Sequence, residues 1–65
     1  MENMKLRYIG RDGYNGLRYG KVYNCTVFEQ DGYIWIEWPL NFWSKRTGMR
    51  PYASNYDVSK CWEGV

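Results

Sequence analysis

The stretch KVYNCTVFEQDGYIWIEW, residues 21–38, decides the fold of this chain. On both sides of Asp31-Gly32 the side chains alternate between two faces, which is the period of a half-buried β-strand. An Asp-Gly pair between two alternating runs is the strongest short-range signal for a tight β-hairpin. The expected core side holds Tyr23, Cys25, Val27, Ile34 and Ile36, and the opposite face holds Asn24, Thr26, Phe28, Tyr33, Trp35 and Glu37.

Upstream of this hairpin the sequence predicts one more strand and a glycine-rich loop. Residues 4–9 alternate in the same way, so we expect Leu6 and Tyr8 to face the core. Residues 10–20 contain four glycines, and Asp-Gly and Asn-Gly pairs among them favour positive φ in tight turns. We therefore expect an irregular loop or small hairpin here.

Downstream of the hairpin, Pro39 ends the second strand because proline lacks the donor that a strand ladder needs. Residues 40–48 then make a long connection that is unusually apolar. Residues 49–53 are expected to form a fourth strand, which Pro51 confines to a sheet edge or a strand end. The remaining expected elements are a turn or one turn of 3₁₀ helix at 54–57 and a short last strand at 58–62.

The chain is expected to be a single domain, residues 1–65, because a sequence this short supports only one core. No segment shows a helical stripe longer than about one turn, so the pattern predicts an all-β fold. Five short strands with glycine-rich turns indicate a small five-stranded barrel, closed or nearly closed. Closure is expected because an open sheet of this size leaves aggregation-prone edges.

Three stretches carry a resemblance to a known group: MKLRYIG at 4–10, LRYGKVY at 17–23 and PYASNYDV at 51–58. In this order they resemble short SH3-like barrel proteins encoded by bacteriophages and prophages, and Gly20 to Tyr23 is the most specific piece. The resemblance implies an SH3-like barrel whose start falls at Met4, which leaves residues 1–3 as a disordered extension. The chain departs from this pattern at 38–48 and at 61–65. SH3-like barrels host unrelated activities, so the resemblance says little about function.

Charge and hydropathy argue against several classes of protein. The net charge is +2, and nine basic and seven acidic residues are mixed along the chain, unlike a polybasic arm for nucleic acid or membrane. The longest uncharged stretches have seven residues each, far below the roughly 20 apolar residues of a membrane span. The N-terminus lacks the apolar run of a secretory signal. We expect a cytoplasmic protein with no membrane contact, in the bacterial host's cytoplasm if a phage encodes it.

The sequence offers little for catalysis or metal binding. It has no histidine, and Cys25 and Cys61 cannot supply a four-ligand zinc site. Glu29, Asp31 and Glu37 flank the hairpin, where solvated surface charges explain them better than a catalytic pair does. We therefore expect no enzymatic activity, no metal and no cofactor. The two cysteines could pair once, although a reduced and partly buried state is favoured.

Aromatic residues make up 20% of the chain, and those outside the alternating core positions suggest a contact surface. Trp, Tyr and Arg dominate interface hot spots. We predict a non-enzymatic binding module, a phage or prophage accessory protein that binds a host protein and modulates or inhibits it, with an anti-defence role by analogy. The predicted partner-binding residues are Tyr14, Arg18, Tyr19, Trp35, Phe42, Trp43, Lys45 and Arg46.

Three alternatives remain open at this point. Phe42 and Trp43 could fold back to plug an open barrel end, which would make them core residues. A homo-oligomer would use the same contact surface. Arginines and lysines interleaved with surface aromatics could also bind single-stranded nucleic acid or a nucleotide, although the acidic residues weaken this alternative.

Overall fold

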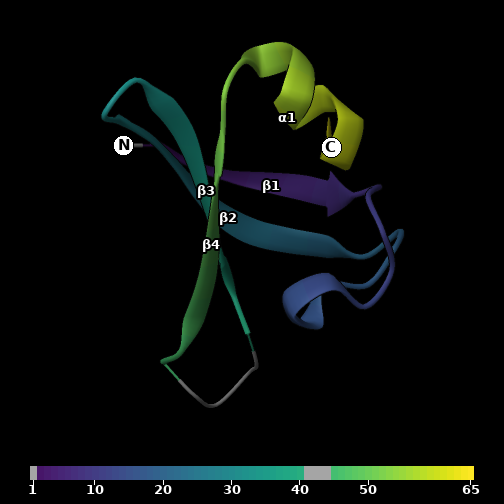
Figure 1. Ribbon diagram of the computed structural model, residues 1–65. Coiled ribbons are helices and arrows are strands. Elements are labelled where there is room, and N and C mark those ends of the chain that lie inside the picture. The colour runs from purple at the N-terminus through teal and green to yellow at the C-terminus, as the bar shows by residue number, and fades with distance from the viewer. Residues whose placement is uncertain (1, 41–44) are drawn as a thin grey trace.

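The computed structural model describes residues 2–40 and 45–65 and consists mostly of β-structure (Figure 1). Its elements are, in chain order, β1 (Glu2–Tyr8), the 3₁₀ turn η1 (Tyr14–Gly16), β2 (Val22–Gln30), β3 (Tyr33–Pro39), β4 (Thr47–Tyr52), α1 (Asn55–Cys61) and β5 (Trp62–Gly64). The five strands form one antiparallel sheet in the order β4-β3-β2-β1-β5. The prediction of a small, five-stranded β fold is confirmed.

The predicted central hairpin is also confirmed. Asp31 and Gly32 both adopt positive φ, 55° and 80°, and Gln30 pairs with Tyr33 on either side of the turn. Positive φ at both central residues is the geometry of the primed turns that match the right-handed twist of paired strands. This turn fixes the register of β2 against β3 and hence the face on which every side chain of the hairpin lies.

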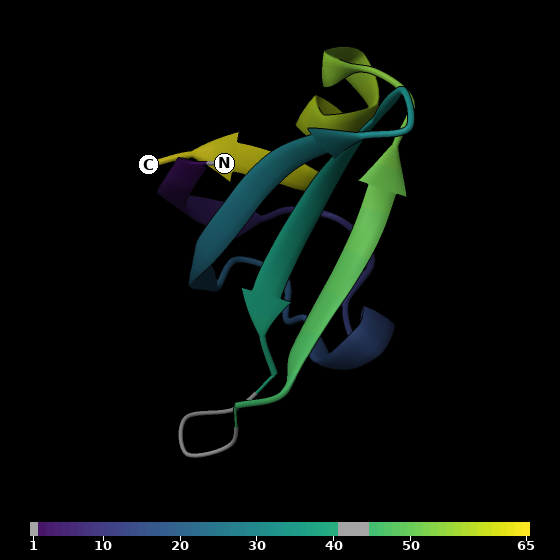
Figure 2. The same ribbon diagram turned by 90° about the vertical axis from the view of Figure 1, so that its left-hand side faces the viewer.

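Strand β2 joins the two parts of a bent sheet. Residues 22–27 pair with β1, whereas residues 26–30 pair with β3. In Figure 1, β1 and the start of β2 run roughly horizontally, whereas β3 and β4 run roughly vertically. Figure 2 shows the sheet curling from β4 round to β5. The concave side of this bend holds the core.

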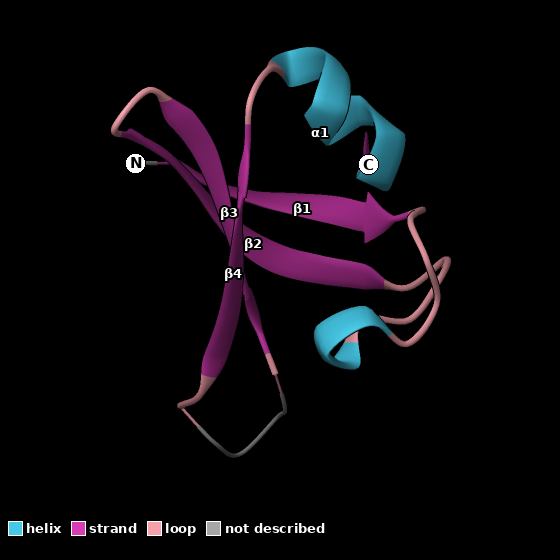
Figure 3. Ribbon diagram, viewed as in Figure 1, coloured by secondary structure: helices cyan, strands magenta, loops and turns pink. Residues whose placement is uncertain are grey.

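The sequence predicted a closed or nearly closed barrel, but the sheet is open. Strands β4 and β5 lie at its two ends, and no ladder joins them among residues 2–40 and 45–65. The reason is local, because the segment between them forms α1 and leaves only three residues, Trp62–Gly64, for β5 (Figure 3). The structure is therefore a curled sheet with one short helix.

Helix α1 corrects the prediction of a last strand at 58–62. The Ser54 hydroxyl accepts a hydrogen bond from the Asp57 N–H at 3.3 Å, and the Val58 N–H donates to the Ser54 carbonyl at 3.1 Å. Ser54 with Asp57 three residues later matches the sequence signature of a helix N-terminus. Val58 and Cys61, three residues apart and so on one side of the helix, pack against the core.

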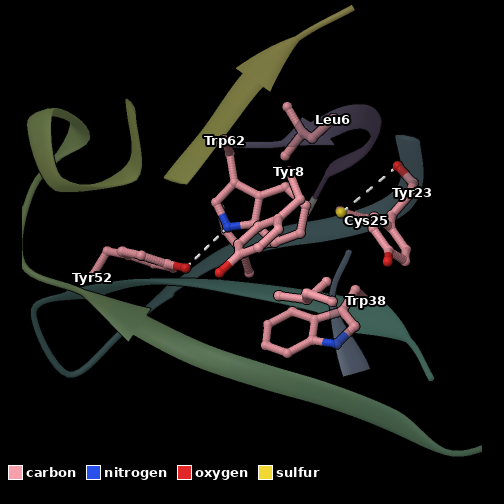
Figure 4. Packing of buried hydrophobic residues seen from close by; sticks show 9 residues of the cluster. Leu6, Tyr8, Tyr23, Cys25, Trp38, Tyr52 and Trp62 are labelled. Carbon is pink, nitrogen blue, oxygen red and sulfur yellow. Dashed lines mark hydrogen bonds between the residues drawn. The ribbon is translucent and has the colours of Figure 1, made fainter. Parts of the chain in front are cut away.

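The core is dominated by aromatic side chains (Figure 4). Its buried members are Leu6, Tyr8, Leu17, Tyr23, Cys25, Ile36, Trp38, Tyr52 and Trp62, and Val27, Ile34, Val58 and Cys61 pack against it. The predicted inward-facing residues of β1, β2 and β3 all lie in these two groups. Trp62 lies among the rings of Tyr8, Tyr23 and Trp38, with centroid distances of 5.1, 6.1 and 5.9 Å. Large rings thus fill a core that a short chain could not fill with small side chains.

Candidate contact surface

An apolar strip crosses the outer, convex face of the sheet. The strand register places Phe28, Trp35 and Pro51 in one row across β2, β3 and β4. The Phe28 and Trp35 rings are stacked, with centroids 6.3 Å apart and planes 6° apart. Tyr33 and Met49 lie on the same face and are 48% and 46% exposed. We call these five residues the outer aromatic patch.

The outer aromatic patch is held in place by main-chain geometry. The Trp35 indole N–H donates to the Gln30 carbonyl at 3.2 Å, which orients the ring along the strand. Each neighbouring pair faces the same way because residues directly opposite one another in a ladder share a face. The patch is therefore a fixed apolar surface, and surfaces of this kind on small proteins commonly mark a binding site.

The glycine-rich loop and the start of the β3–β4 connection meet at one end of the molecule, which we call the loop end. Leu40 lies over Gly16, where a Cβ would approach its Cδ2 to 3.6 Å. The Leu40 N–H in turn donates to the Arg46 carbonyl at 3.0 Å. Within the loop, the Tyr19 N–H donates to the Asp12 carboxylate at 2.9 Å and leaves the Tyr19 ring 66% exposed.

Tyr14 makes a second contact between the glycine-rich loop and the sheet, with Arg50 of β4. The Arg50 guanidinium lies 5.4 Å from the Tyr14 ring centroid and 4.8 Å from that of Tyr52. Its Nη1 is 3.9 Å from the Cys61 sulfur. The cation–π contact with Tyr14 ties the loop to β4 and is worth on the order of 0.5–1 kcal/mol at exposed sites, and the contact with the Cys61 sulfur joins Arg50 to α1.

The structure divides the predicted partner-binding residues between two surfaces. Trp35 lies on the outer aromatic patch, whereas the loop end carries Tyr14, Arg18, Tyr19, Lys45 and Arg46. Phe42 and Trp43 lie outside the described residues. Sequence reasoning missed the rest of the patch, although a two-residue turn at Asp31-Gly32 already implies that Phe28 opposes Trp35.

Both cysteines are free thiols, and their surroundings differ. Cys25 is 1% exposed, and burial raises the pKa of its thiol from about 9 to about 12. Cys61 is partly exposed at the end of α1. The nucleophile in alkylation is the thiolate, so Cys25 is protected both by its surroundings and by its protonation state.

We expect iodoacetamide at neutral pH to modify Cys61 in the folded protein and to leave Cys25 unmodified. Peptide mass spectrometry after a time course gives the two rates separately. The same reaction in concentrated urea is the control, and there both thiols should react. Equal rates in the folded protein would contradict the burial of Cys25.

Other kinds of site are not found in the part of the chain that the structure describes. There, no group of three or more cysteine, aspartate and glutamate side chains is arranged to hold a metal ion. No helix among the described residues has the length and hydropathy to span a membrane. No family model, no curated protein and no solved structure matches the chain.

Proposed function

We propose that the chain is a non-enzymatic binding module with an SH3-like barrel fold, a phage or prophage accessory protein that binds a host protein and modulates or inhibits it. The observation that carries the binding function is the outer aromatic patch, in which two stacked, part-exposed rings share one face with exposed Tyr33, Met49 and Pro51. Aromatic residues and methionine are enriched in protein interfaces, where charged residues are depleted. An anti-defence role in the bacterial cytoplasm is the specific form of this proposal.

The SH3-like part of the proposal is supported by the strand order. β1 pairs with both β2 and β5, so the first and last strands lie side by side in the bent sheet. A short helix immediately precedes the last strand. Fold alone does not select an activity, so the binding proposal depends on the patch and not on this resemblance.

The outer aromatic patch can be tested by placing charge on it without touching the core. Tyr33 and Met49 are both about half exposed, so a Tyr33→Lys/Met49→Lys variant should remain folded. In pull-downs from bacterial lysate with quantitative mass spectrometry, the variant should lose a stoichiometric protein partner by about tenfold or more, the cost of losing a hot spot.

Tyr56→Lys is the matched control, because Tyr56 is 70% exposed on α1 and lies off the patch. It should retain the partner as the wild type does. Capture of nucleic acid with no stoichiometric protein would refute the protein-binding proposal. If the double variant and the control captured equal amounts of the partner, the partner would bind a surface other than the outer aromatic patch.

A second candidate function, binding of single-stranded nucleic acid or a nucleotide, is favoured by one observation. The two segments that meet at the loop end, with the residue that follows the glycine-rich loop, contain exposed rings and five cationic residues, Arg11, Arg18, Lys21, Lys45 and Arg46. Two acids lie near them, and each accepts a hydrogen bond: Asp12 from the Tyr19 N–H and Glu37 from the Thr47 hydroxyl. If this candidate is right, the affinity for an oligo-dT strand falls steeply with salt. A flat response to salt would exclude it.

A further inference from the structure

Strand β2 carries unpaired main-chain groups along its first half. The Tyr8 N–H donates to the Lys21 carbonyl at 2.9 Å, so the main-chain groups of Lys21 face β1. Successive residues of a strand point their N–H and C=O groups to opposite sides. The main-chain groups of Tyr23 and Cys25 therefore also face β1. The main-chain groups of Val22 and Asn24 face away from β1.

On that other side, β3 does not cover Val22 and Asn24. The ladder between β2 and β3 runs only from Thr26 to Gln30 on β2. Continuing its register by two residues would set Asn24 opposite Pro39, which has no N–H to donate. On the other edge of β3, Pro39 pairs with Thr47 of β4. Among residues 2–40 and 45–65, the main-chain groups of Val22 and Asn24 thus have no strand partner.

A pocket of about 300 Å³ lies at the point where β2 and β3 separate. It is lined by Gly16, Lys21, Val22, Tyr23, Asn24, Pro39 and Leu40. This lining contains no acidic residue, and it contains one lysine. Val22 and Leu40 supply apolar contacts and are 37% and 40% exposed. We call this feature the open slot of β2.

We propose that the open slot of β2 receives an extended, acidic segment of a partner protein, which adds to Val22 and Asn24 as a strand. The main chain of the segment exchanges hydrogen bonds with Val22 and Asn24, as in other cases of strand addition. Its acidic side chains meet Lys21 and the neighbouring cations of the loop end. Apolar side chains on its alternate positions contact Val22 and Leu40. This proposal rests on the proposed protein-binding function and names the chemistry of the partner.

The open state of the slot is tested first, on the free protein. Amide hydrogen exchange followed by NMR should show Val22 and Asn24 exchanging faster than Tyr23 and Cys25, which donate toward β1. This alternation is expected only if one side of β2 is uncovered. Slow exchange at Asn24, equal to that of Cys25, would show that the slot is already filled and would overturn the proposal.

The chemistry of the occupant is tested with a short peptide of alternating aspartate and valine, capped at both ends. Addition of this peptide should slow exchange at Val22 and Asn24, and a lysine–valine peptide of the same length should not. Lys21→Glu and Asn24→Pro should each weaken binding about tenfold, since each removes one interaction of the slot. The matched control is Lys60→Glu, because Lys60 lies on α1. This variant should bind the peptide as the wild type does.

The two variants also keep the test decisive if one of them is poorly folded. Asn24→Pro loses no hydrogen bond to β1. Lys21→Glu reverses an exposed charge and removes the contact of the Lys21 ammonium with the Tyr23 ring. Equal binding of the lysine–valine peptide, or displacement of the acidic peptide by an oligo-dT strand with no protection at Asn24, would overturn the proposal. Loss of a lysate partner in the Tyr33→Lys/Met49→Lys variant but not in Asn24→Pro would retain the proposed function and reject the slot.

Discussion

Replacing Trp62 with alanine should leave most of the protein unfolded at room temperature. The Trp62 ring is 3% exposed and makes edge or tilted contacts with Tyr8, Tyr23 and Trp38. Its indole N–H also donates to the Tyr52 hydroxyl at 3.0 Å. A buried Trp→Ala change costs about 3–5 kcal/mol, whereas small domains have only about 0.05–0.15 kcal/mol of stability per residue. For a chain of 65 residues these two quantities are comparable.

Urea unfolding followed by circular dichroism would measure the loss, with Tyr56→Ala as the matched aromatic control. Tyr56 lies on the adjacent helix, is 70% exposed and contacts the Lys60 ammonium at 4.6 Å from its ring centroid. Its truncation should change the free energy of unfolding by less than about 0.5 kcal/mol. Trp62→Phe should fall between the two, because it keeps a ring but removes the donor to Tyr52. A wild-type midpoint for Trp62→Ala would mean that Trp62 is not central to the core.

The sequence predicted the parts of the fold that depend on local signals. Strand alternation and the Asp31-Gly32 turn fix the register of β2 and β3. The inward positions of that hairpin therefore follow from counting every second residue away from the turn. Leu17, Trp38, Tyr52 and Trp62 were not predicted as core residues, although all four are buried. Each enters the core from a loop or from a strand end. Trp38 continues the alternation of Ile34 and Ile36, so periodicity could have placed it, whereas the burial of the other three depends on how the sheet bends.

Helix α1 shows a different limit of pattern reasoning. Val58, Cys61 and Trp62 are spaced as on one face of a helix, but a stretch of five residues is too short for periodicity to decide, and the Ser54 cap is the additional helix signal. The same segment determines whether the sheet can close, because residues in α1 cannot extend β5. Missing the Ser54 cap therefore accounts for both errors, the last strand placed at 58–62 and the closed barrel.

The candidate contact surface was predictable by residue type but not by position. Trp35 was assigned to the outer face correctly, yet its neighbours Met49 and Pro51 come from β4, whose register depends on the length of the connection. The open slot of β2 follows from where Pro39 falls in the ladder. The effect of Pro39 on the strand ladder was expected, since proline ends a strand pairing. The pocket beside it depends on Leu40 and Gly16 approaching from different parts of the chain.

Replacing Gly48 with alanine should destabilise the protein by about 1–3 kcal/mol, the usual cost of overpacking a core. Gly48 lies opposite Trp38 in the β3–β4 ladder, and a Cβ there would approach Cε2 and Cζ2 of the indole to 2.7 Å. The indole cannot retreat easily, because Trp38 is 1% exposed and packs against Trp62. The expected sign is notable because Gly→Ala inside a strand otherwise gains about 0.5–1 kcal/mol.

Gly64→Ala provides the matched control for this prediction, since Gly64 is also in a strand, has no positive φ and has no atom within 4 Å of an added Cβ. It should be neutral or slightly stabilising, so the urea midpoint should fall for Gly48→Ala and stay the same or rise for Gly64→Ala. Because the change in chemistry is the same, the difference between them isolates the contact with Trp38. If Gly48→Ala matched Gly64→Ala, the Trp38 ring would not lie against β4, and the bend that places it over Gly48 would be wrong.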